Sequence, residues 1–376
     1  GNSITSGGNY NVVVGDEAGT ALTTGDNNVA IGFEALKTED GHGNNVAIGH
    51  QALKTLNAGA AGENTAVGYL AGTALTLGVG NTLTGTNSGD ELTHADFNTA
   101  IGTGTLGSDT QGNKSTAIGY AALFAQNQTD DTNNTAVGYL SGTAITVGVR
   151  NTLVGDRSGA ALTDADKNTA IGGESLTTDT LGSKSTAIGR SALKSQNFTT
   201  ATDSHNTAVG NSAGESITTG VNNTLIGGNA GDLLTDADLN VAVGTGALGS
   251  DTLGSKTTAI GKDALGVQNF TTATDTFNTA VGYFAGAAVT TGTANTLLGG
   301  LAGDNLTIGS RNVAVGVSAL HNDLAGSKNV AVGTRALTTQ SFTTATDSYN
   351  VAVGEDAGLE VTTGVQNTFI GGLSGD

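Results

Sequence analysis

The residue types that most often carry chemistry are sparse in this sequence and form no recognisable catalytic group. The five histidines are His42, His50, His94, His205 and His321. None of them recurs at a regular interval, and none has the Ser and Asp partners from which a catalytic triad is built. The sequence therefore predicts that the chain is not an enzyme and has no catalytic residues.

Two further patterns could hold ions. Gly-rich segments such as residues 102–104 lack the Lys and the following helix that a phosphate-binding loop needs. Paired aspartates recur in residues 164–166 and 236–238, but the equivalent segments are His-Ala-Asp at 94–96 and Ile-Gly-Ser at 308–310. Repeats that bind calcium carry Gly-Gly-x-Gly-x-Asp runs, and none is present. We expect solvated acidic loops without metal or cofactor, with calcium binding as the alternative.

Composition narrows the class of partner. The chain has 376 residues with 33 acidic and 14 basic side chains, which gives a formal net charge of −19. Affinity for nucleic acid comes from Lys and Arg on phosphates, so no nucleic-acid partner is expected. There is no Cys for a disulfide framework. No apolar run is long enough for a membrane span, and no signal peptide is recognisable.

The sequence also lacks Met, the initiator included. This predicts that the chain is a piece of a longer or processed protein. Residues 1–5 match residues 214–218, and the last residue, Asp376, falls within a repeat. We therefore expect the chain to begin and end inside repeats.

A five-residue pattern organises the whole chain. It reads Asn-Thr-Ala-Val-Gly at residues 64–68 and returns at 134–138, 206–210 and 278–282. Looser copies fill the intervals between these. The 21 copies start at residues 11, 28, 45, 64, 81, 98, 115, 134, 151, 168, 185, 206, 223, 240, 257, 278, 295, 312, 329, 350 and 367. The step between starts is seventeen, except for a longer step of nineteen or twenty-one before residues 64, 134, 206, 278 and 350. A short fixed period of this kind indicates a repeat architecture.

Residue types follow the position within each copy, which we count from the Asn as position 0. Position 4 is Gly in all 21 copies, position 3 is Val or Ile in nearly all, position 2 is mostly Ala, and position 1 is Thr or Val. The alternation predicts a short strand over these five residues, ended by the Gly. Seventeen residues cannot hold two helices, but they can form one turn of a β-solenoid with two or three short strands. We therefore predict an all-β fold: a parallel β-solenoid of about 21 coils, each of seventeen residues, forming one elongated domain over residues 1–376.

The Asn at position 0 is replaced only by Ser115, Ser185 and Thr257. Stacked Asn side chains can bond along a ladder, and Asn also suits tight turns. The replacement by Ser and Thr is consistent with such a structural role, and a binding role for this column is the alternative.

A longer period of four coils lies on top of the first, so that the coil starting at residue 134 corresponds to the one starting at residue 206. Position 8 alternates between two Gly coils and two Leu coils, as in Gly72 and Leu106. Where position 8 is Gly, position 11 is aliphatic, as in Leu75, so volume lost at one position is regained at the other.

The longer steps between copies predict loops that bulge from one face of the solenoid. Three of these loops carry Phe198, Phe270 and Phe342 at the same place. Each Phe either folds back onto its widened coil or forms a contact with a neighbouring fibre or glycan.

Both faces of the predicted strand are apolar. Positions 1 and 3 share one face and position 2 lies on the other. One face should line the core of the coil, and burial of the second would need another chain. We expect the small residues at position 2, such as Ala136, Ala170 and Ala208, to face that chain, and we predict a homotrimer.

Residues 44–49, Asn-Asn-Val-Ala-Ile-Gly, resemble the Ser-Val-Ala-Ile-Gly repeat of YadA-like trimeric autotransporter heads. Residues 223–227, with Gly220 before them and Ala230 and Gly231 after them, resemble repeats of phage tail-fibre proteins. The first resemblance implies a trimeric left-handed β-roll on a bacterial surface. The second implies a shaft of repeats in a tail fibre.

Taken together, these features predict a structural fibre shaft of a virion tail fibre or extracellular appendage that supports attachment to a host or surface. The expected location is extracellular, on a virion or cell surface, and the expected partner is the chain itself, as a homotrimer or a higher-order fibre. The alternative is a bacterial surface adhesin or binding module whose rod face or bulge loops bind a cell-surface glycan, ice or a neighbouring fibre. Ice binding would use the Thr column at position 1, but Val interrupts that column and we expect its face to be buried.

Overall fold

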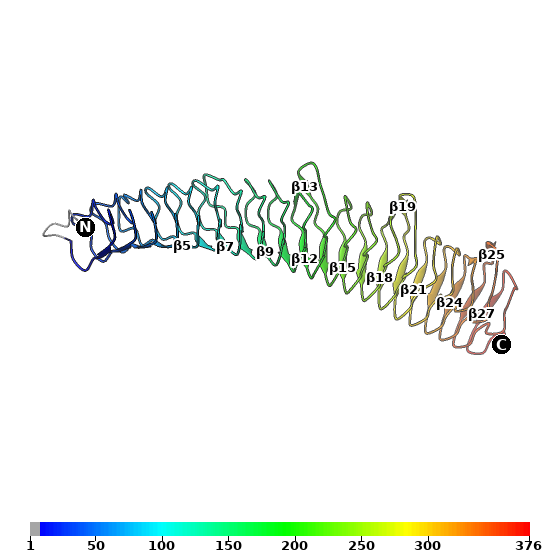
Figure 1. Ribbon diagram of the computed structural model, residues 1–376. Helices are drawn as coiled ribbons and strands as arrows, with labels where there is room; N and C mark the ends of the chain where they lie inside the picture. Colours follow the sequence, from blue (N-terminus) through cyan, green and yellow to red (C-terminus); the bar gives the residue numbers. More distant parts are fainter. Residues whose placement is uncertain (1–7) are drawn as a thin grey trace. The chain divides into compact units, whose positions relative to one another are not determined.

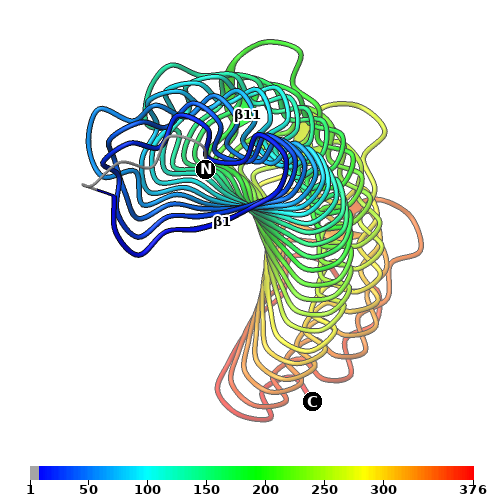
Figure 2. The ribbon, with the colours of Figure 1, turned by 60° about the vertical axis from the view of Figure 1, so that its left-hand side comes forward.

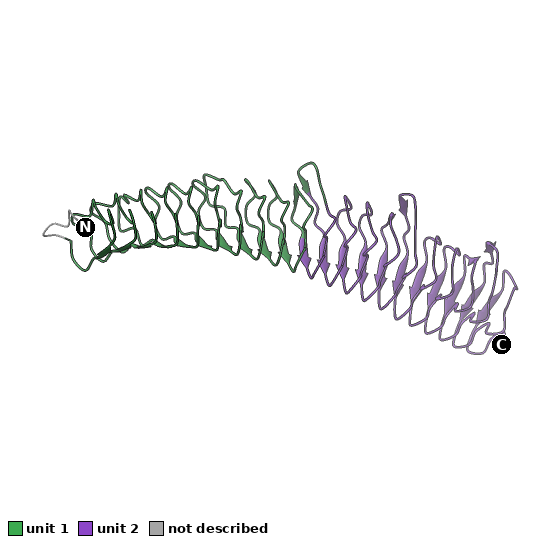
Figure 3. Ribbon diagram, viewed as in Figure 1, with its two compact units in different colours: residues 1–185, 197–202 green, residues 186–196, 203–376 purple. Residues whose placement is uncertain are grey.

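The computed structural model describes residues 8–376 (Figure 1). The match between residues 1–5 and residues 214–218 lies outside this part of the chain. The described residues form strands and turns without a helix, so they contain no helix that could cross a membrane. They form two compact units, shown in Figure 3: the described residues up to Ser185 with 197–202, and Thr186–Gln196 with Asp203–Asp376.

Each unit is a stack of coils, and each coil contributes one three-residue strand to a parallel sheet. Unit 1 contains β1 (Val12–Val14), β2 (Val29–Ile31), β3 (Val46–Ile48), β4 (Thr65–Val67), β5 (Thr82–Thr84), β6 (Thr99–Ile101), β7 (Thr116–Ile118), β8 (Thr135–Val137), β9 (Thr152–Val154) and β10 (Thr169–Ile171). Unit 2 contains β12 (Thr186–Ile188), β14 (Thr207–Val209), β15 (Thr224–Ile226), β16 (Val241–Val243), β18 (Thr258–Ile260), β20 (Thr279–Val281), β21 (Thr296–Leu298), β22 (Val313–Val315), β24 (Val330–Val332), β26 (Val351–Val353) and β27 (Thr368–Ile370).

The remaining strands are two residues long and lie away from these sheets. They are β11 (Gly182–Ser183), β13 (Thr202–Asp203), β17 (Gly254–Ser255), β19 (Thr274–Asp275), β23 (Gly326–Ser327) and β25 (Thr346–Asp347). Most coils therefore hold a single strand, not the two or three that the sequence suggested, because the other residues of the coil follow turns.

The register between neighbouring coils confirms the parallel β-solenoid. β4 pairs with β5 so that Thr65 lies beside Thr82, Ala66 beside Leu83, and Val67 beside Thr84. The same positions are aligned in the other strand pairs within each unit, from β1 with β2 to β26 with β27. Each position of the repeat therefore forms a column along the stack.

The position 2 column lies in the core of the chain's own coil, which corrects our expectation that it faces another chain. Ala136, Ala170 and Ala208 are fully buried within the single chain. The Leu residues that replace Ala in this column, such as Leu83, are buried as well. The outward face consists of positions 1 and 3 instead, because the strand alternates and the turns of the coil close over position 2.

Gly at position 4 is required by backbone geometry. Gly138 has φ of +146°, a region that L side chains rarely adopt. A Cβ on Gly138 would lie 2.2 Å from the carbonyl oxygen of Gly155, the equivalent residue of the next coil. The Gly column is therefore a seam along which two backbones touch.

Three other columns also turn through positive φ, and they do so with large side chains. Leu70 at position 6 has φ of +58°, and Leu106 at position 8 has φ of +49°. Residues directly before position 0, such as Lys114 with φ of +59°, adopt the same conformation. The sequence did not predict these corners, since Leu and Lys carry no preference for left-handed backbone.

The compensation of volume between positions 8 and 11 is confirmed. A Cβ on Gly89 would lie 2.6 Å from Cδ1 of Leu92, the aliphatic residue at position 11 of the same coil. It would also lie 3.0 Å from Cδ2 of Leu83, a position 2 side chain. The two Gly coils of each group therefore make room for a large residue at position 2 as well as at position 11.

The Asn column forms the predicted ladder. Asn81 is fully buried; its backbone N donates to Oδ1 of Asn64 in the preceding coil at 3.0 Å. Its Nδ2 donates to the carbonyl oxygen of Ala95 across the coil at 2.7 Å. Asn81 thus joins two coils and also bonds across its own coil, so its side-chain polar atoms are occupied within the chain.

Within each unit, successive coils are also turned relative to one another. Figure 2 shows this as a fan of coil outlines. Parallel strands that twist in a constant sense produce such a rotation.

Candidate functional site

Buried carboxylates in the core are the first group of side chains that could take part in chemistry. Asp109 at position 11 is fully buried and accepts a hydrogen bond from the backbone N of Gly112 at 3.0 Å. Nε2 of Gln126, at position 11 of the next coil, donates to Oδ2 of Asp109 at 2.6 Å. Oε1 of Gln126 accepts from Nδ2 of Asn134 at 2.9 Å. Burial raises the pKa of the Asp109 carboxyl, and the hydrogen bonds from Gln126 and Gly112 oppose that rise.

This Asp–Gln–Asn chain recurs in later groups of four coils. In unit 2, Gln268 donates to Asp251 at 2.6 Å and Gln340 donates to Asp323 at 2.5 Å. The chain also reaches two of the substituted residues of the Asn column, whereas the equivalent coil with Gln340 keeps Asn329. Ser115 and Thr257 take a short side chain where the Gln enters, and Nε2 of Gln126 donates to Ser115 Oγ at 3.1 Å.

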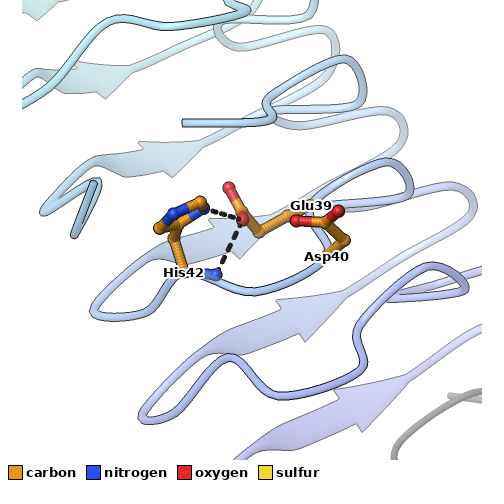
Figure 4. Close-up of side chains that lie close together, drawn as sticks. All are labelled: Glu39, Asp40 and His42. Carbon is orange, nitrogen blue, oxygen red and sulfur yellow. Dashed lines mark hydrogen bonds and ion pairs between the residues drawn. The ribbon is translucent and has the colours of Figure 1, made fainter. Parts of the chain in front are cut away.

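Glu39, Asp40 and His42 form the one cluster in residues 8–376 whose ligand atoms lie close enough to hold a metal ion, within 4.8 Å of one another. Figure 4 shows Glu39 between the other two residues. Glu39 is fully buried and stands at position 11, the place of Asp109. Its oxygens accept from the backbone N of His42 at 3.0 Å and of Ala58 at 3.2 Å. The Glu therefore performs the same structural task as the buried aspartates, with Nδ1 of His42 at 3.2 Å as an additional contact.

The aspartate pairs do not gather into a metal cluster in the part of the chain that is described. Asp166 accepts from the backbone N of Val149 at 2.8 Å, and Asp238 accepts from Val221 in the same way at 2.7 Å. Asp164 is exposed. One carboxylate of each pair thus caps the backbone of the preceding coil, while the other faces solvent.

Two further carboxylates, Glu34 and Asp304, form ion pairs and have shifted pKa values. Glu34 lies 2.5 Å from Nζ of Lys37 and 2.6 Å from Nζ of Lys54. Hydrogen bonds from Lys37 and then Lys54 lower the pKa of Glu34 to about 2. His321 pairs with Asp304, whose pKa is raised by burial despite that contact.

The bulge loops are packed against their own coils through the Phe side chains. Phe198, Phe270 and Phe342 are only 6 to 7% exposed. The backbone N of Phe270 donates to the buried carboxylate of Asp251 at 3.0 Å, and β19 of the loop pairs with β17. The Phe rings therefore fold back onto the coil. The outermost residues of the loop, such as Thr271 and Thr272, are exposed.

The outward sheet face is a regular surface that continues along the strands of each unit. Position 1 carries Thr or Val, and position 3 carries Val or Ile, and most of these side chains are half-exposed. Ile101 and Ile226 are 39% and 40% exposed. Our expectation that the Thr column shares a buried face is wrong for the single chain.

Aromatic and basic side chains flank this face in two further columns. At position 5, the rings of Tyr120 and Tyr139 stack with centroids 5.4 Å apart. In the column directly before position 0, Nζ of Lys256 lies over the ring of Phe277, 5.4 Å from its centroid. Fold geometry thus concentrates exposed apolar side chains around the strands.

No protein-family model matches this sequence, and comparison with curated proteins gives no match. The fold and its surfaces are therefore the basis for assigning a function.

Proposed function

We propose that the chain is the structural shaft of an extracellular fibre, such as a virion tail fibre or a surface appendage, and not an enzyme. One observation carries the proposal: the strand pairs align the same positions of the repeat throughout both units, so that one coil is built on the next without a change of register. Such a stack grows by repetition and supplies length and stiffness.

The four-coil group supports a role in which length matters. The group has its own internal polar chain and its own alternation of core residues, so it is the smallest segment that can be added or removed without disturbing packing. Residues 206–277 make up one such group, from Asn206 to Phe277. Addition of one such group would lengthen a shaft by about 19 Å at the spacing of parallel strands.

Deletion of residues 206–277 tests the proposal. The shortened protein should fold, and electron micrographs should show a particle shorter by about 19 Å. The matched control is deletion of residues 206–239, which removes two Gly coils and leaves Leu coils on both sides of the junction. It should lose stability because the core volumes no longer complement each other. A four-coil deletion that unfolds, or that leaves the particle length unchanged, would contradict a modular shaft.

We also propose that the shaft works as a homotrimer on the outside of a cell or virion. The support is the apolar character of the outward sheet face, which a single chain leaves in water. Sedimentation equilibrium of the full chain should give three times the monomer mass of 36.8 kDa. A different whole-number mass would change the copy number without affecting the role as a shaft.

A further inference from the structure

Charge is distributed unevenly between the sheet face and the rest of the molecule. The sheet face is defined here as positions 0 to 5 of every coil together with the residue directly before position 0. It contains nine of the 14 basic residues but only four of the 33 acidic ones. Its formal charge is therefore +5, while the remainder of the chain carries −24. The basic residues are Lys114, Arg150, Lys167, Lys184, Arg190, Lys256, Lys262, Arg311 and Lys328, and the acidic ones are Asp16, Glu63, Asp156 and Glu355.

Loop aspartates at the border of this face reduce the imbalance without reversing it. Lys256 pairs with Asp275, and Lys328 pairs with Asp347; each pair joins two neighbouring coils. If these two and the equivalent Asp131 and Asp203 are counted with the sheet face, the face still carries +1 and the remainder −20. The net negative charge of the chain therefore lies outside the sheet face.

The charge pattern indicates which partner can cover the face. Two copies of a chain with a net charge of −19 repel each other through any acidic surface. They can approach through the sheet face without that repulsion, and the Val and Ile side chains there gain from burial. Within the strands themselves, positions 1 to 3 contain no charged residue, so no charge would be buried unpaired.

The area of the face in each unit follows from the dimensions of its strands. A three-residue strand is roughly 10 Å long and neighbouring strands lie about 4.8 Å apart, so the ten strands of unit 1 offer a face of about 500 Å². Unit 2 offers a similar area with 11 strands. Stable interfaces bury about 800 Å² per partner, so the face of each unit by itself supplies more than half of that area.

Polar side chains on the face favour one orientation. Thr84 is the single hydroxyl in the position 3 column, and it lies on the same strand as Thr82. When copies run parallel and in register, the Thr84 hydroxyls meet each other and not an aliphatic side chain. The rotation of successive coils in Figure 2 is then shared by all copies, which can wind around a common axis.

We infer that the sheet face is the surface through which copies of this chain associate, parallel and in register, with positions 1 and 3 at the centre. This inference rests on the proposed shaft function and names its partner and its contact surface. It replaces position 2 with positions 1 and 3 as the residues that face the neighbouring chain.

Cysteine cross-linking tests the orientation, because the chain has no Cys of its own. Thr82 is exposed on the fifth of the 21 coils. In a parallel, in-register assembly, a Thr82→Cys variant should form a disulfide between copies under mild oxidation, and non-reducing gels should show a covalent dimer. The control is Thr200→Cys, which lies exposed in a loop away from the face and should stay monomeric on the gel. In an antiparallel assembly the introduced thiols of two copies would lie many coils apart, so the absence of a cross-link in an associated protein would overturn the orientation.

Charge substitution tests the surface itself. Val154→Glu with Ile171→Glu places two carboxylates on the face, where the side chains are half-exposed and exposed in the single chain. The variant should sediment as a monomer at a concentration at which the unaltered chain is associated, with an unchanged β-type circular dichroism spectrum. A Thr178→Glu variant, changed at an exposed residue on another side, should associate like the parent. An unaltered chain that is monomeric, or a double variant that still associates, would overturn the inference. Neither result would affect the deletion test of the shaft.

Discussion

At the scale of single residues, position 4 is the most restricted position of the repeat, because every copy carries Gly there. Gly138→Val places a β-branched side chain at φ of +146° and against the backbone of Gly155. Strain of this kind costs about 1–3 kcal/mol, and the overlap with a neighbouring backbone adds to it. The free energy of unfolding from urea titration should fall accordingly. Gly173→Ala is the control, since no atom lies within 4 Å of its added Cβ, and it should leave stability almost unchanged.

The buried carboxyl of Asp109 gives a pH dependence with a defined sign. Its pKa is raised in the folded state, so its contribution to stability is present below the unfolded value and is lost as pH rises through the folded value. The unfolded Asp pKa is about 3.9. The melting temperature of the parent relative to Asp109→Asn should therefore increase as pH falls from 7 to about 4. The same comparison with Asp164→Asn, an exposed carboxyl, should show little change with pH. If the melting temperature of the parent falls relative to that of Asp109→Asn on acidification, the raised pKa is contradicted.

At the scale of the coil, the bulge loops behave as parts of the core. Phe270 is 7% exposed, and its backbone is tied to Asp251. Phe270→Ala should lower the free energy of unfolding by about 3 kcal/mol or more, as other buried aromatic truncations do. Thr271→Ala, at the exposed tip of the same loop, should leave it unchanged. If Phe270→Ala keeps its stability but associates less, the Phe ring would instead form a contact with a neighbouring fibre.

The position 2 column leads to a second prediction at this scale. Ala170 is fully buried inside its own coil, so Ala170→Glu buries an unpaired charge. We expect loss of β-type circular dichroism, and not the selective loss of association that a contact with another chain would give. Thr169→Glu, one residue away but on the outward face, should retain the fold.

The sequence was sufficient to predict the coil, its period and the alternation of core volumes, because each depends on a residue type that recurs at a fixed position. For the Asn column and the Phe residues the same periodicity left two accounts open, and the structure supports the ladder and the packed ring. The direction in which the strand faces did not follow, since Ala, Val and Ile suit a core equally well on either side. The buried Asp–Gln–Asn chain was also missed. Its signal, an Asp at position 11 with a Gln at position 11 of the next coil, is visible at Asp109 and Gln126, but an isolated acidic residue in a repeat is more often a surface residue.

At the scale of the whole molecule, the four-coil period is present in the core and in the bulge loops but hardly at all in the strands. Positions 8 and 11 change from coil to coil, whereas the strands on the outside repeat almost every coil. A neighbouring copy shifted by one coil would therefore meet nearly the same Thr, Val and Ile side chains. The register between copies therefore depends on the Thr84 hydroxyl and on two columns that vary along the chain, position 5 and the residue before position 0.

The extra pairs between loop and coil have a mechanical consequence. Coil boundaries follow one another in series along each stack, while the hydrogen bonds across any one boundary act side by side. Under tension along the stack, the boundary with the fewest bonds opens first. β17 with β19 and β23 with β25 add bonds to one boundary in each of their groups of four. Rupture under load should therefore begin between coils that lack a loop pair, and the boundary that holds the buried aspartate should be among the last to part.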